Sequence, residues 1–197
     1  MVKNLLKACF MMAALAAAGQ AAAETYTVGS GGTYRPFEFE NSQKQLEGFD
    51  IDIIKAIARA EGFDVKLVNT PWEGIFATLG TGDRDIIISG ITITDKRKQM
   101  VDFSAPYFPA EQSIVVPEGS KVHSLAALKN EKVGVVNSST GDIVVSQELG
   151  KNSTSIKRFD NTPLMLQELF EDGVSAAVGD VGVVKYYIKQ HPEKQFK

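Results

Sequence analysis

The chain has 197 residues, which is enough for one large domain or two small lobes. Its 21 Lys and Arg residues against 24 Asp and Glu residues give a formal charge of −3, too near balance for a nucleic-acid-binding surface or a polybasic membrane anchor. A hydrophobic content of 44% with 23% charged residues indicates a globular chain rather than a disordered one. One cysteine excludes a disulfide framework, and two histidines leave little for a metal centre or a His-based triad. We therefore expect no metal and no cofactor.

Residues 1–23 have the pattern of a secretory signal peptide. Two lysines precede a short apolar run over residues 8–19, and three alanines at positions 21–23 provide a cleavage site. The run is shorter than the roughly 20 apolar residues that span a bilayer, so export is favoured over a membrane anchor. Cys9 lies near the start of the run, which argues against a lipoprotein. Removal of this segment leaves an acidic, cysteine-free chain suited to the bacterial periplasm.

The first half of the remaining chain alternates strands and helices. Strands are expected over residues 26–29, 64–69 and 85–89, the last a continuous apolar run typical of a buried parallel strand. A helix is expected over residues 50–62, ending at Gly62, with an apolar face formed by Ile51, Ile54, Ile57 and Ala58. Residues 72–79 form a second candidate helix.

The second half continues the alternation. Strands are expected over residues 132–136, 155–159 and 174–178, and helices over residues 140–149, 162–170 and 181–190. This order predicts an α/β fold with right-handed crossovers. Ser104–Pro109 breaks the rhythm with two prolines in four residues, which indicates an extended connection between two lobes. We expect lobe 1 over residues 24–108 and lobe 2 over residues 109–197.

Two Gly-containing segments of the first half follow strands. Residues 29–33 open no helix, so a turn is favoured over a phosphate-binding loop. Residues 89–97 leave the carboxyl end of a buried strand, where open α/β sheets place ligands. There Gly90 permits close approach, Thr92 adds a hydroxyl, and Arg97 offers a planar fork to a carboxylate. The alternative is that Thr94 or Asp95 caps a short helix and Arg97 is a solvated surface charge.

Polar residues follow strands in the second half as well. Residues 138–142 open a helix, whose free N–H groups suit an anion, although capping by Ser139 or Thr140 is the simpler interpretation. Asp180 precedes another helix, either as its N-cap or as a carboxylate that receives an ammonium. Tyr34 and Trp72 could stack on a ligand or pack in the core. An arginine for a carboxylate and an aspartate for an ammonium together describe an α-amino acid held between two lobes.

Five stretches carry a resemblance to a known family: residues 33–39, 48–53, 90–94, 96–98 and 101–104. Through essentially all of residues 24–197, the sequence resembles the periplasmic polar-amino-acid-binding proteins of bacterial ABC importers. The resemblance implies a bilobal clamshell of two α/β lobes joined by a hinge, with the ligand in the cleft. It also implies a monomeric receptor that closes on an L-α-amino acid and presents it to a membrane permease.

The resemblance also implies roles for particular residues. Tyr34 and Trp72 correspond to aromatic walls, while Ser89, Gly90 and Thr92 correspond to the turn that holds the α-amino and α-carboxylate groups. Arg97 corresponds to the carboxylate fork. Thr140 and Gly141 correspond to second-lobe carboxylate contacts, and Asp180 to the acceptor of the α-ammonium group.

Two departures from the family pattern matter. Many relatives carry an aspartate two or three residues before the aromatic that Tyr34 matches, whereas this chain has Gly31-Gly32, which favours a neutral or polar side chain over a basic one. Relatives also continue beyond the position of Lys197, and we expect the first lobe to be incomplete without that return.

Two other function classes stay open. The same fold resembles a periplasmic cyclohexadienyl dehydratase, for which Glu38 or Glu111 would have to act as acid or base, although no residue pair requires catalysis. A sensory ligand-binding module without a transport role is the third possibility.

Overall fold

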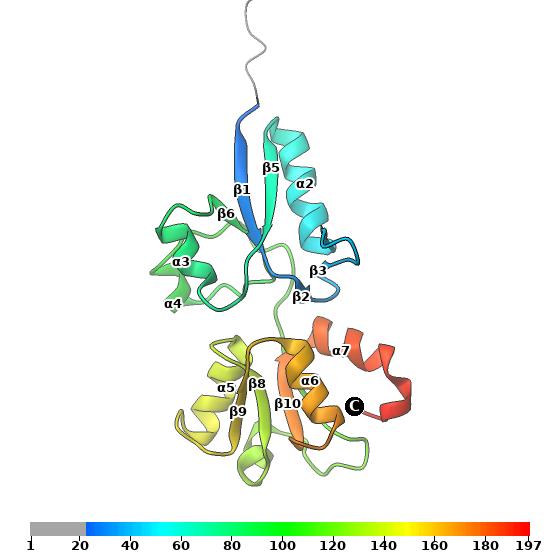
Figure 1. The fold of residues 1–197 in the computed structure, drawn as a ribbon. Coiled ribbons are helices and arrows are strands. Elements are labelled where there is room, and N and C mark those ends of the chain that lie inside the picture. The colour runs from blue at the N-terminus through cyan, green and yellow to red at the C-terminus, as the bar shows by residue number, and fades with distance from the viewer. Residues whose placement is uncertain (1–22) are drawn as a thin grey trace, which may run out of the picture.

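The chain forms two α/β lobes that lie one above the other in a computed structural model, which describes residues 23–197 (Figure 1). The expected signal peptide therefore falls, except for its last residue, outside the described residues. Residues 99–111 are mostly irregular and connect the lobes. Within residues 23–197, no helix combines the length and apolar character that a membrane crossing needs. The predicted bilobal α/β fold is confirmed.

The first lobe is built on a three-stranded parallel sheet in the order β5-β1-β6. Two helices pack beside it, with α2 and α3 on opposite sides of the β1–β5 pair (Figure 1). Val28, Ile54 and Ile88 form its buried centre. The elements are β1 (Thr25–Ser30), α2 (Phe49–Glu61), β5 (Asp64–Asn69), α3 (Ile75–Gly80), β6 (Ile86–Ile87) and α4 (Asp95–Lys98).

Helix α2 follows the predicted apolar pattern with one exception. Gly62 adopts a left-handed conformation with φ 77° and its N–H donates to the carbonyl of Ala58, as a C-terminal glycine should. Ile51 and Ile54 are buried, but Ile57 is 45% exposed, so its expected place in the core is wrong. Ile57 instead faces an apolar groove of the first lobe, described below.

A small antiparallel sheet that the sequence did not predict joins β1 to α2. Its strands are β2 (Thr33–Tyr34), β3 (Glu38–Glu40) and β4 (Leu46–Glu47), in that order. Tyr34 and Glu38 are directly paired across β2 and β3. This sheet places both side chains at the edge of the first lobe that faces the second.

The second lobe is built on a four-stranded sheet in the order β7-β10-β8-β9, in which only β7 runs antiparallel to its neighbour. Helix α5 packs on one side of the sheet and α6 and α7 on the other (Figure 1). The elements are β7 (Gln112–Val115), η1 (Leu125–Asn130), β8 (Val133–Val136), α5 (Thr140–Leu149), β9 (Ile156–Phe159), α6 (Thr162–Phe170), β10 (Ala176–Asp180), α7 (Val181–Gln190) and η2 (Pro192–Lys194).

Three predicted elements differ from the structure by more than one residue at an end. Strand β6 covers only two residues of the expected 85–89, because it pairs with β1 at Val28 and Gly29 alone before the chain turns away. Helix α3 begins at Ile75 rather than at residue 72, after Gly74 with φ 79°. Strand β10 covers Ala176–Asp180 instead of residues 174–178, because its antiparallel pairing with β7 continues to Gln112.

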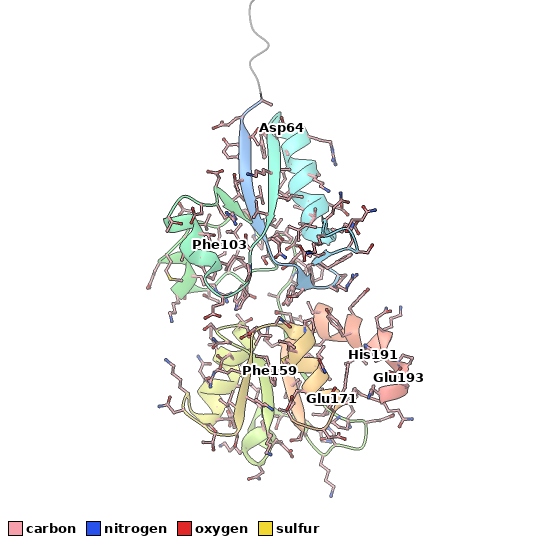
Figure 2. All side chains as sticks on the ribbon, viewed as in Figure 1. Asp64, Phe103, Phe159, Glu171, His191 and Glu193 are labelled. Carbon is pink, nitrogen blue, oxygen red and sulfur yellow. The ribbon has the colours of Figure 1, made fainter. Side chains whose placement is uncertain are left out.

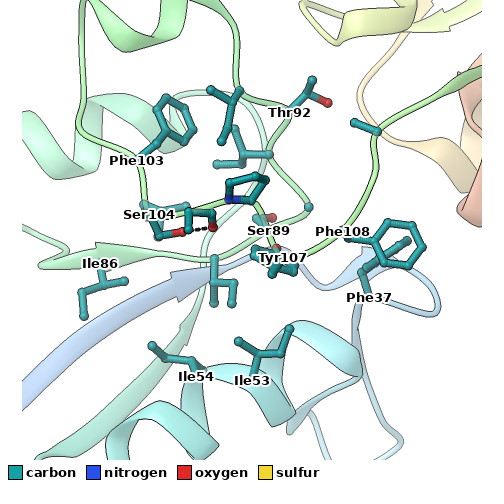
Figure 3. Close-up of a pocket in the computed structure, with 18 of the residues that line it drawn as sticks. Phe37, Ile53, Ile54, Ile86, Ser89, Thr92, Phe103, Ser104, Tyr107 and Phe108 are labelled. Carbon is teal, nitrogen blue, oxygen red and sulfur yellow. Dashed lines mark hydrogen bonds between the residues drawn. The ribbon is translucent and has the colours of Figure 1, made fainter. Parts of the chain in front are cut away.

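An apolar groove of about 650 Å³ opens mainly on the first lobe (Figure 3), and residues 180–182 of the second lobe also line it. Ile53 and Ile54 of α2 line it together with Ile86 of β6, and Phe103 and Phe108 come from the connection between the lobes. Phe108 is 45% exposed. The groove is thus an apolar surface that the described residues leave partly open.

Candidate functional site

A cavity of about 350 Å³ lies between the two lobes. Eight of the nine residues predicted for the site line it. The first lobe contributes Tyr34, Trp72, Ser89, Gly90, Thr92 and Arg97, and the second contributes Thr140 and Asp180. Residues more than 140 positions apart in the sequence are thereby brought to one cavity.

Arg97 is buried at this cavity, with 6% of its surface exposed. Its backbone N–H donates to the hydroxyl of Thr94, which caps the four-residue helix α4. The guanidinium lies 5.2 Å from the ring centroid of Trp72 and donates to the carbonyls of Thr92, at 2.9 Å, and of Ser138, at 3.4 Å. Burial lowers the pKa of Arg97, and the charge of Asp180 opposes that change. The alternative of a solvated surface charge is therefore wrong, although capping by Thr94 is confirmed.

Asp180 ends β10 and is the residue before α7, but its side chain does not cap the helix. The carboxylate instead accepts hydrogen bonds from the hydroxyl of Tyr34 and from Nε2 of Gln112, the latter at 2.6 Å. Burial raises the pKa of Asp180, while these two hydrogen bonds and the charge of Arg97 lower it. The expected side-chain cap is absent because β10 holds the carboxylate toward the first lobe.

Four polar contacts that involve residues predicted for the site join the lobes around the cavity. The indole N–H of Trp72 donates to the carbonyl of Asn137 at 2.9 Å, and the hydroxyls of Thr92 and Thr140 lie 3.5 Å apart. The other two are the contacts of Arg97 with Ser138 and of Tyr34 with Asp180. The cavity is thus bounded by both lobes in a closed arrangement.

The turn at Ser89 and Gly90 is held in place by contacts within the first lobe. Gly90 has φ 55°, and a Cβ atom there would lie 2.7 Å from Cε1 of Tyr34, so only glycine fits against that ring. The N–H of Gly90 donates to Asp50 at 2.6 Å. Ser89 donates its hydroxyl proton to Glu38 at 2.7 Å and accepts from the N–H of Gly31 at 3.1 Å.

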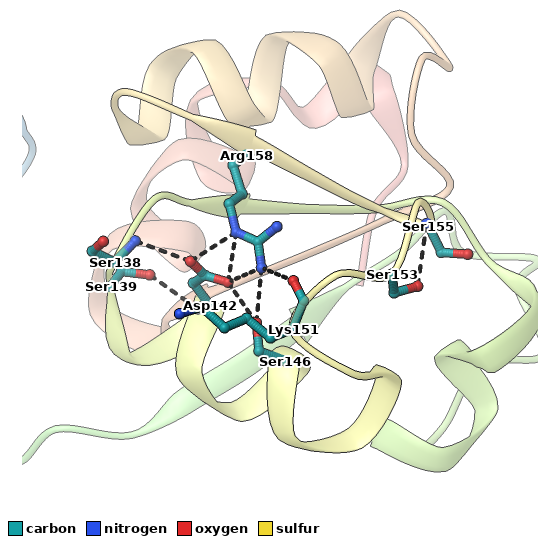
Figure 4. Close-up of polar contacts among 8 residues, drawn as sticks. All are labelled: Ser138, Ser139, Asp142, Ser146, Lys151, Ser153, Ser155 and Arg158. Carbon is teal, nitrogen blue, oxygen red and sulfur yellow. Dashed lines mark hydrogen bonds and ion pairs between the residues drawn. The ribbon is translucent and has the colours of Figure 1, made fainter.

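The second-lobe loop is held by an ion pair between Asp142 and Arg158 (Figure 4). Arg158 donates from Nε to both carboxylate oxygens at 3.0 Å, and the N–H of Ser138 donates to the same carboxylate at 3.0 Å. Ser139 caps α5 by accepting from the N–H of Asp142, which confirms one of the two capping candidates. Thr140 is left free to present its hydroxyl, which accepts from Gln112 at 3.0 Å.

Gly141 is the one predicted residue that does not line the cavity. It is buried in α5, and a Cβ atom at this position would lie 2.7 Å from the carbonyl oxygen of Val178. The glycine therefore allows α5 to pack closely on β10.

Several residues at the cavity were not predicted for the site. Glu38, Glu73 and Asp160 add carboxylates to its lining. Gln112 holds Asp180 and Thr140 from β7, a position that follows from the Asp180–Gln112 register and has no local sequence pattern. The sequence suggested Glu38 only as a candidate acid or base of an enzyme. Gly31 and Gly32, where many relatives have an aspartate, also line the cavity.

The histidines and Glu111 lie elsewhere. His123 is exposed, and His191 lies 3.2 Å from Glu193 beyond the end of α7, away from the cavity (Figure 2). Glu111 is exposed and lines the apolar groove. Within residues 23–197, no cluster of three His, Cys, Asp or Glu side chains has the geometry of a metal site.

Known proteins share this fold. A relative described as "Probable histidine-binding protein" from Neisseria gonorrhoeae is 44% identical over 172 residues, which cover 87% of this chain and 64% of the relative. A solved structure described as "An ancestral arginine-binding protein bound to glutamine" has a TM-score of 0.81 at 41% identity, covering 88% of this chain and 76% of that one. The ancestral amino acid-binding protein AncCDT-1, described as a precursor of cyclohexadienyl dehydratase, has a TM-score of 0.79 at 39% identity, covering 84% and 74%.

The chain thus spans about two thirds of the length of the Neisseria relative. Residues 26–181 match the family described as "Bacterial extracellular solute-binding proteins, family 3". The match covers most of both lobes, including all nine residues predicted for the site, and confirms the family predicted from the sequence. The chain belongs to the family 3 extracellular solute-binding proteins of bacteria.

Proposed function

We propose that the protein is a periplasmic receptor that captures an L-α-amino acid with a neutral or polar side chain and delivers it to an ABC-type permease. The observation that carries this proposal is the placement of Arg97 and Asp180 at one cavity, on opposite lobes. A guanidinium fork suits the α-carboxylate, and a buried carboxylate suits the α-ammonium group. A ligand held at both ends favours closure, because it contacts both lobes only when they are together. The expected N-terminal signal peptide supports a periplasmic location.

The side-chain preference rests on Gly31 and Gly32. Neither residue supplies a carboxylate, and a Cβ atom on Gly32 would lie 2.8 Å from Nδ2 of Asn69, so the segment is tightly packed. L-Histidine, with a neutral imidazole above its pKa, and L-glutamine both meet this preference. The Neisseria relative and the glutamine-bound ancestral protein support these two as first ligands to test.

A basic side chain is the second candidate. Glu73 and Asp160 line the cavity, whereas Arg97 is the only cation among the described residues that line it. Carboxylates that remain after the ligand ammonium is paired would favour a second positive charge. L-Arginine and L-lysine therefore belong in the same binding panel.

The test is a fluorescence titration of Trp72, the single tryptophan, with a panel of amino acids at pH 7. We expect saturable binding of histidine or glutamine, weaker binding of arginine and lysine, and no response to sugars, peptides or metal ions. Stronger binding of arginine or lysine would replace the neutral preference with the basic one. Binding of sugars, peptides or metal ions alone would contradict the proposal.

An enzymatic function is tested in parallel, because the AncCDT-1 structure is described as a dehydratase precursor. Of the two acids that the sequence offered for such chemistry, Glu38 lines the cavity, whereas Glu111 lies outside it. Turnover of prephenate or arogenate by the wild-type protein, lost in Glu38→Gln, would favour the enzyme. We expect no turnover.

A further inference from the structure

Two carboxyl groups are buried together beneath the cavity. Glu38 on β3 is 1% exposed and Asp50, in the first turn of α2, is fully buried. Glu38 also lines the cavity itself. Neither takes part in an ion pair among residues 23–197. Two buried anions without a cation are too costly to coexist, so one of them has to carry a proton.

The hydrogen-bond partners indicate where that proton lies. Asp50 accepts from the N–H of Gly90 at 2.6 Å and from the hydroxyl of Tyr107 at 3.0 Å, which suits a carboxylate. Glu38 accepts at Oε1 from Ser89, but its Oε2 is buried and accepts from no donor. The backbone N–H of Asp50 donates to the carbonyl of Phe37 at 2.9 Å, which sets Asp50 beside Glu38. A proton on Oε2 would therefore turn this unpaired acceptor into a donor to Asp50.

The electrostatics of the surrounding groups agree with this placement. Burial raises the pKa of Glu38 well above its usual range, the charge of Asp50 adds to the increase, and the Ser89 hydrogen bond opposes it. Burial also raises the pKa of Asp50, against the hydrogen bonds from Gly90, Tyr107 and Glu38. The other titratable and charged groups that face the pair are Asp180 of β10, Tyr34 of β2, Tyr107 of the interlobe connection and, through Asp180, Arg97 of α4.

We propose that Glu38 and Asp50 share one proton and that this pair positions the Ser89–Gly90 turn against the ligand. The role in binding rests on the proposed function above, whereas the shared proton and the fixed turn do not. Both oxygens that hold the turn, Oε1 of Glu38 and Oδ2 of Asp50, belong to the pair. Loss of the proton at alkaline pH puts two anions side by side and releases the turn.

The shared proton is tested without any ligand, by urea unfolding of the full chain between pH 5 and pH 8. The unfolded chain has Glu38 at an ordinary pKa of about 4.3, so above that pH the folded state binds the extra proton and its stability falls as the pH rises toward the raised pKa. Glu38→Gln removes this pH dependence of the stability, because glutamine has no proton to release. We expect wild type to release about one proton more on unfolding than Glu38→Gln. Asp52→Asn, an exposed neighbour on α2, is the matched control and should retain the wild-type slope.

The fixed turn is tested by the amide proton resonance of Gly90 in the ligand-free protein. In wild type it should lie downfield, as expected for a short hydrogen bond to a carboxylate, and should titrate at alkaline pH. In Glu38→Gln it should stay downfield without titrating, and in Asp50→Asn it should move upfield. Equal unfolding slopes for wild type and Glu38→Gln would overturn the shared proton, and an unchanged Gly90 resonance in Asp50→Asn would overturn the positioning.

The ligand arm uses L-histidine between pH 7 and pH 9, where its imidazole is neutral. Glu38→Gln should bind within about threefold of wild type at pH 7 and lose less affinity by pH 9, because it still pairs with Ser89 and Asp50. Glu38→Ala should bind about tenfold or more weakly, since it leaves Ser89 and Asp50 without their partner. Wild-type affinity in Glu38→Ala would overturn the role in binding. If wild type binds no amino acid of the panel, the proposed function fails, while the unfolding slopes and the Gly90 resonance still decide the shared proton and the fixed turn.

Discussion

Arg97 and Asp180 face one another across the lobes, and each has protein partners that hold it in place. Arg97 is stacked beside Trp72 and anchored to Thr92, and Asp180 is held by Tyr34 and Gln112. The partners within the same lobe, Trp72 and Thr92 for Arg97 and Gln112 for Asp180, do not depend on closure, which lowers the entropy cost of binding.

Arg97→Ala should remove the carboxylate end of the site. Truncating one partner of a buried charge pair costs about 2–5 kcal/mol, which corresponds to a loss of roughly 30-fold to several-thousand-fold in affinity. Because Arg97 is buried, the melting temperature without ligand should also fall. Calorimetric titration well below the melting temperature separates the two effects. Lys96→Ala, an exposed cation on the same helix, is the control and should bind as wild type does. Unchanged affinity in Arg97→Ala would place the carboxylate elsewhere.

Asp180→Asn should remove the ammonium end while leaving the fold intact. The side chain makes no cap bond, so asparagine costs α7 nothing, and its carbonyl still accepts from Tyr34 or Gln112. A hydrogen bond to a charged group contributes about 1.5–3 kcal/mol, so affinity should fall by roughly tenfold or more. Titration and thermal melting of this variant should be compared with Asp64→Asn, remote from the cavity (Figure 2). Weakened folding with unchanged affinity would make Asp180 a structural residue only.

The sequence could identify the charged residues of the site but not their surroundings. Arg97 and Asp180 were recognisable from their positions after strands, yet each kept a capping or surface alternative, because burial depends on Trp72 and Tyr34 from other elements. Gln112 could not be found at all, since its role depends on antiparallel pairing with β10. Gly141 was predicted in the site but serves the packing of α5 on β10.

At the scale of elements, the start of α5 depends on the ion pair between Asp142 and Arg158. Ser138, whose carbonyl accepts from Arg97, has a positive φ of 58° and donates its N–H to Asp142. Burial of Asp142 would raise its pKa, but the hydrogen bonds from Arg158, Ser138 and Ser146 outweigh it, so the pKa is lowered.

Arg158→Ala should release this loop from Asp142. The pair is partly exposed, so we expect a loss of about 1–2 kcal/mol in the free energy of unfolding at pH 7. Because the pKa of Asp142 is lowered in the folded state, its ion pair adds stability above about pH 3.9 that is lost as the pH falls through the folded-state pKa. The difference in unfolding free energy between wild type and Arg158→Ala should therefore shrink toward pH 3. Urea unfolding at pH 7 and pH 3 measures both. Lys157→Ala on the same strand removes a partly exposed ion pair with Glu168 and a contact with the Phe159 ring, and should change little. A difference that does not depend on pH would contradict the account.

The ends of helices could be predicted from the sequence where neighbouring residues determine them. The bounds of α5, α6 and α7 were predicted correctly, and Ser139 and Asn161 cap the first two. The sheet of β2, β3 and β4 was missed because strands of two or three residues have no detectable period. Strand β7 was missed because prolines precede it and its pairing partner, β10, lies far along the chain, with Gln112 paired to Asp180.

For the whole molecule, closure around a ligand should appear as increased stability. A ligand that binds only the folded state at 100 times its Kd adds about 2.7 kcal/mol, which for a chain of this size raises the melting temperature by roughly 5–11 °C. Thermal melting with and without the amino acid measures this shift, with Arg97→Ala as the variant in which it should be small. An equal shift in both proteins would mean that the ligand stabilises another part of the molecule.

In the function proposed above, the cavity between the lobes holds an α-amino acid at both of its ends. The most direct measurement is calorimetric titration of the wild-type protein with its tightest-binding amino acid and with the analogues that lack the carboxylate or the ammonium. For L-histidine these analogues are histamine and imidazolepropionate. The account predicts one site per chain and at least about tenfold weaker binding of each analogue, because each leaves Arg97 or Asp180 without its partner. Binding of either analogue as tightly as the amino acid would contradict it.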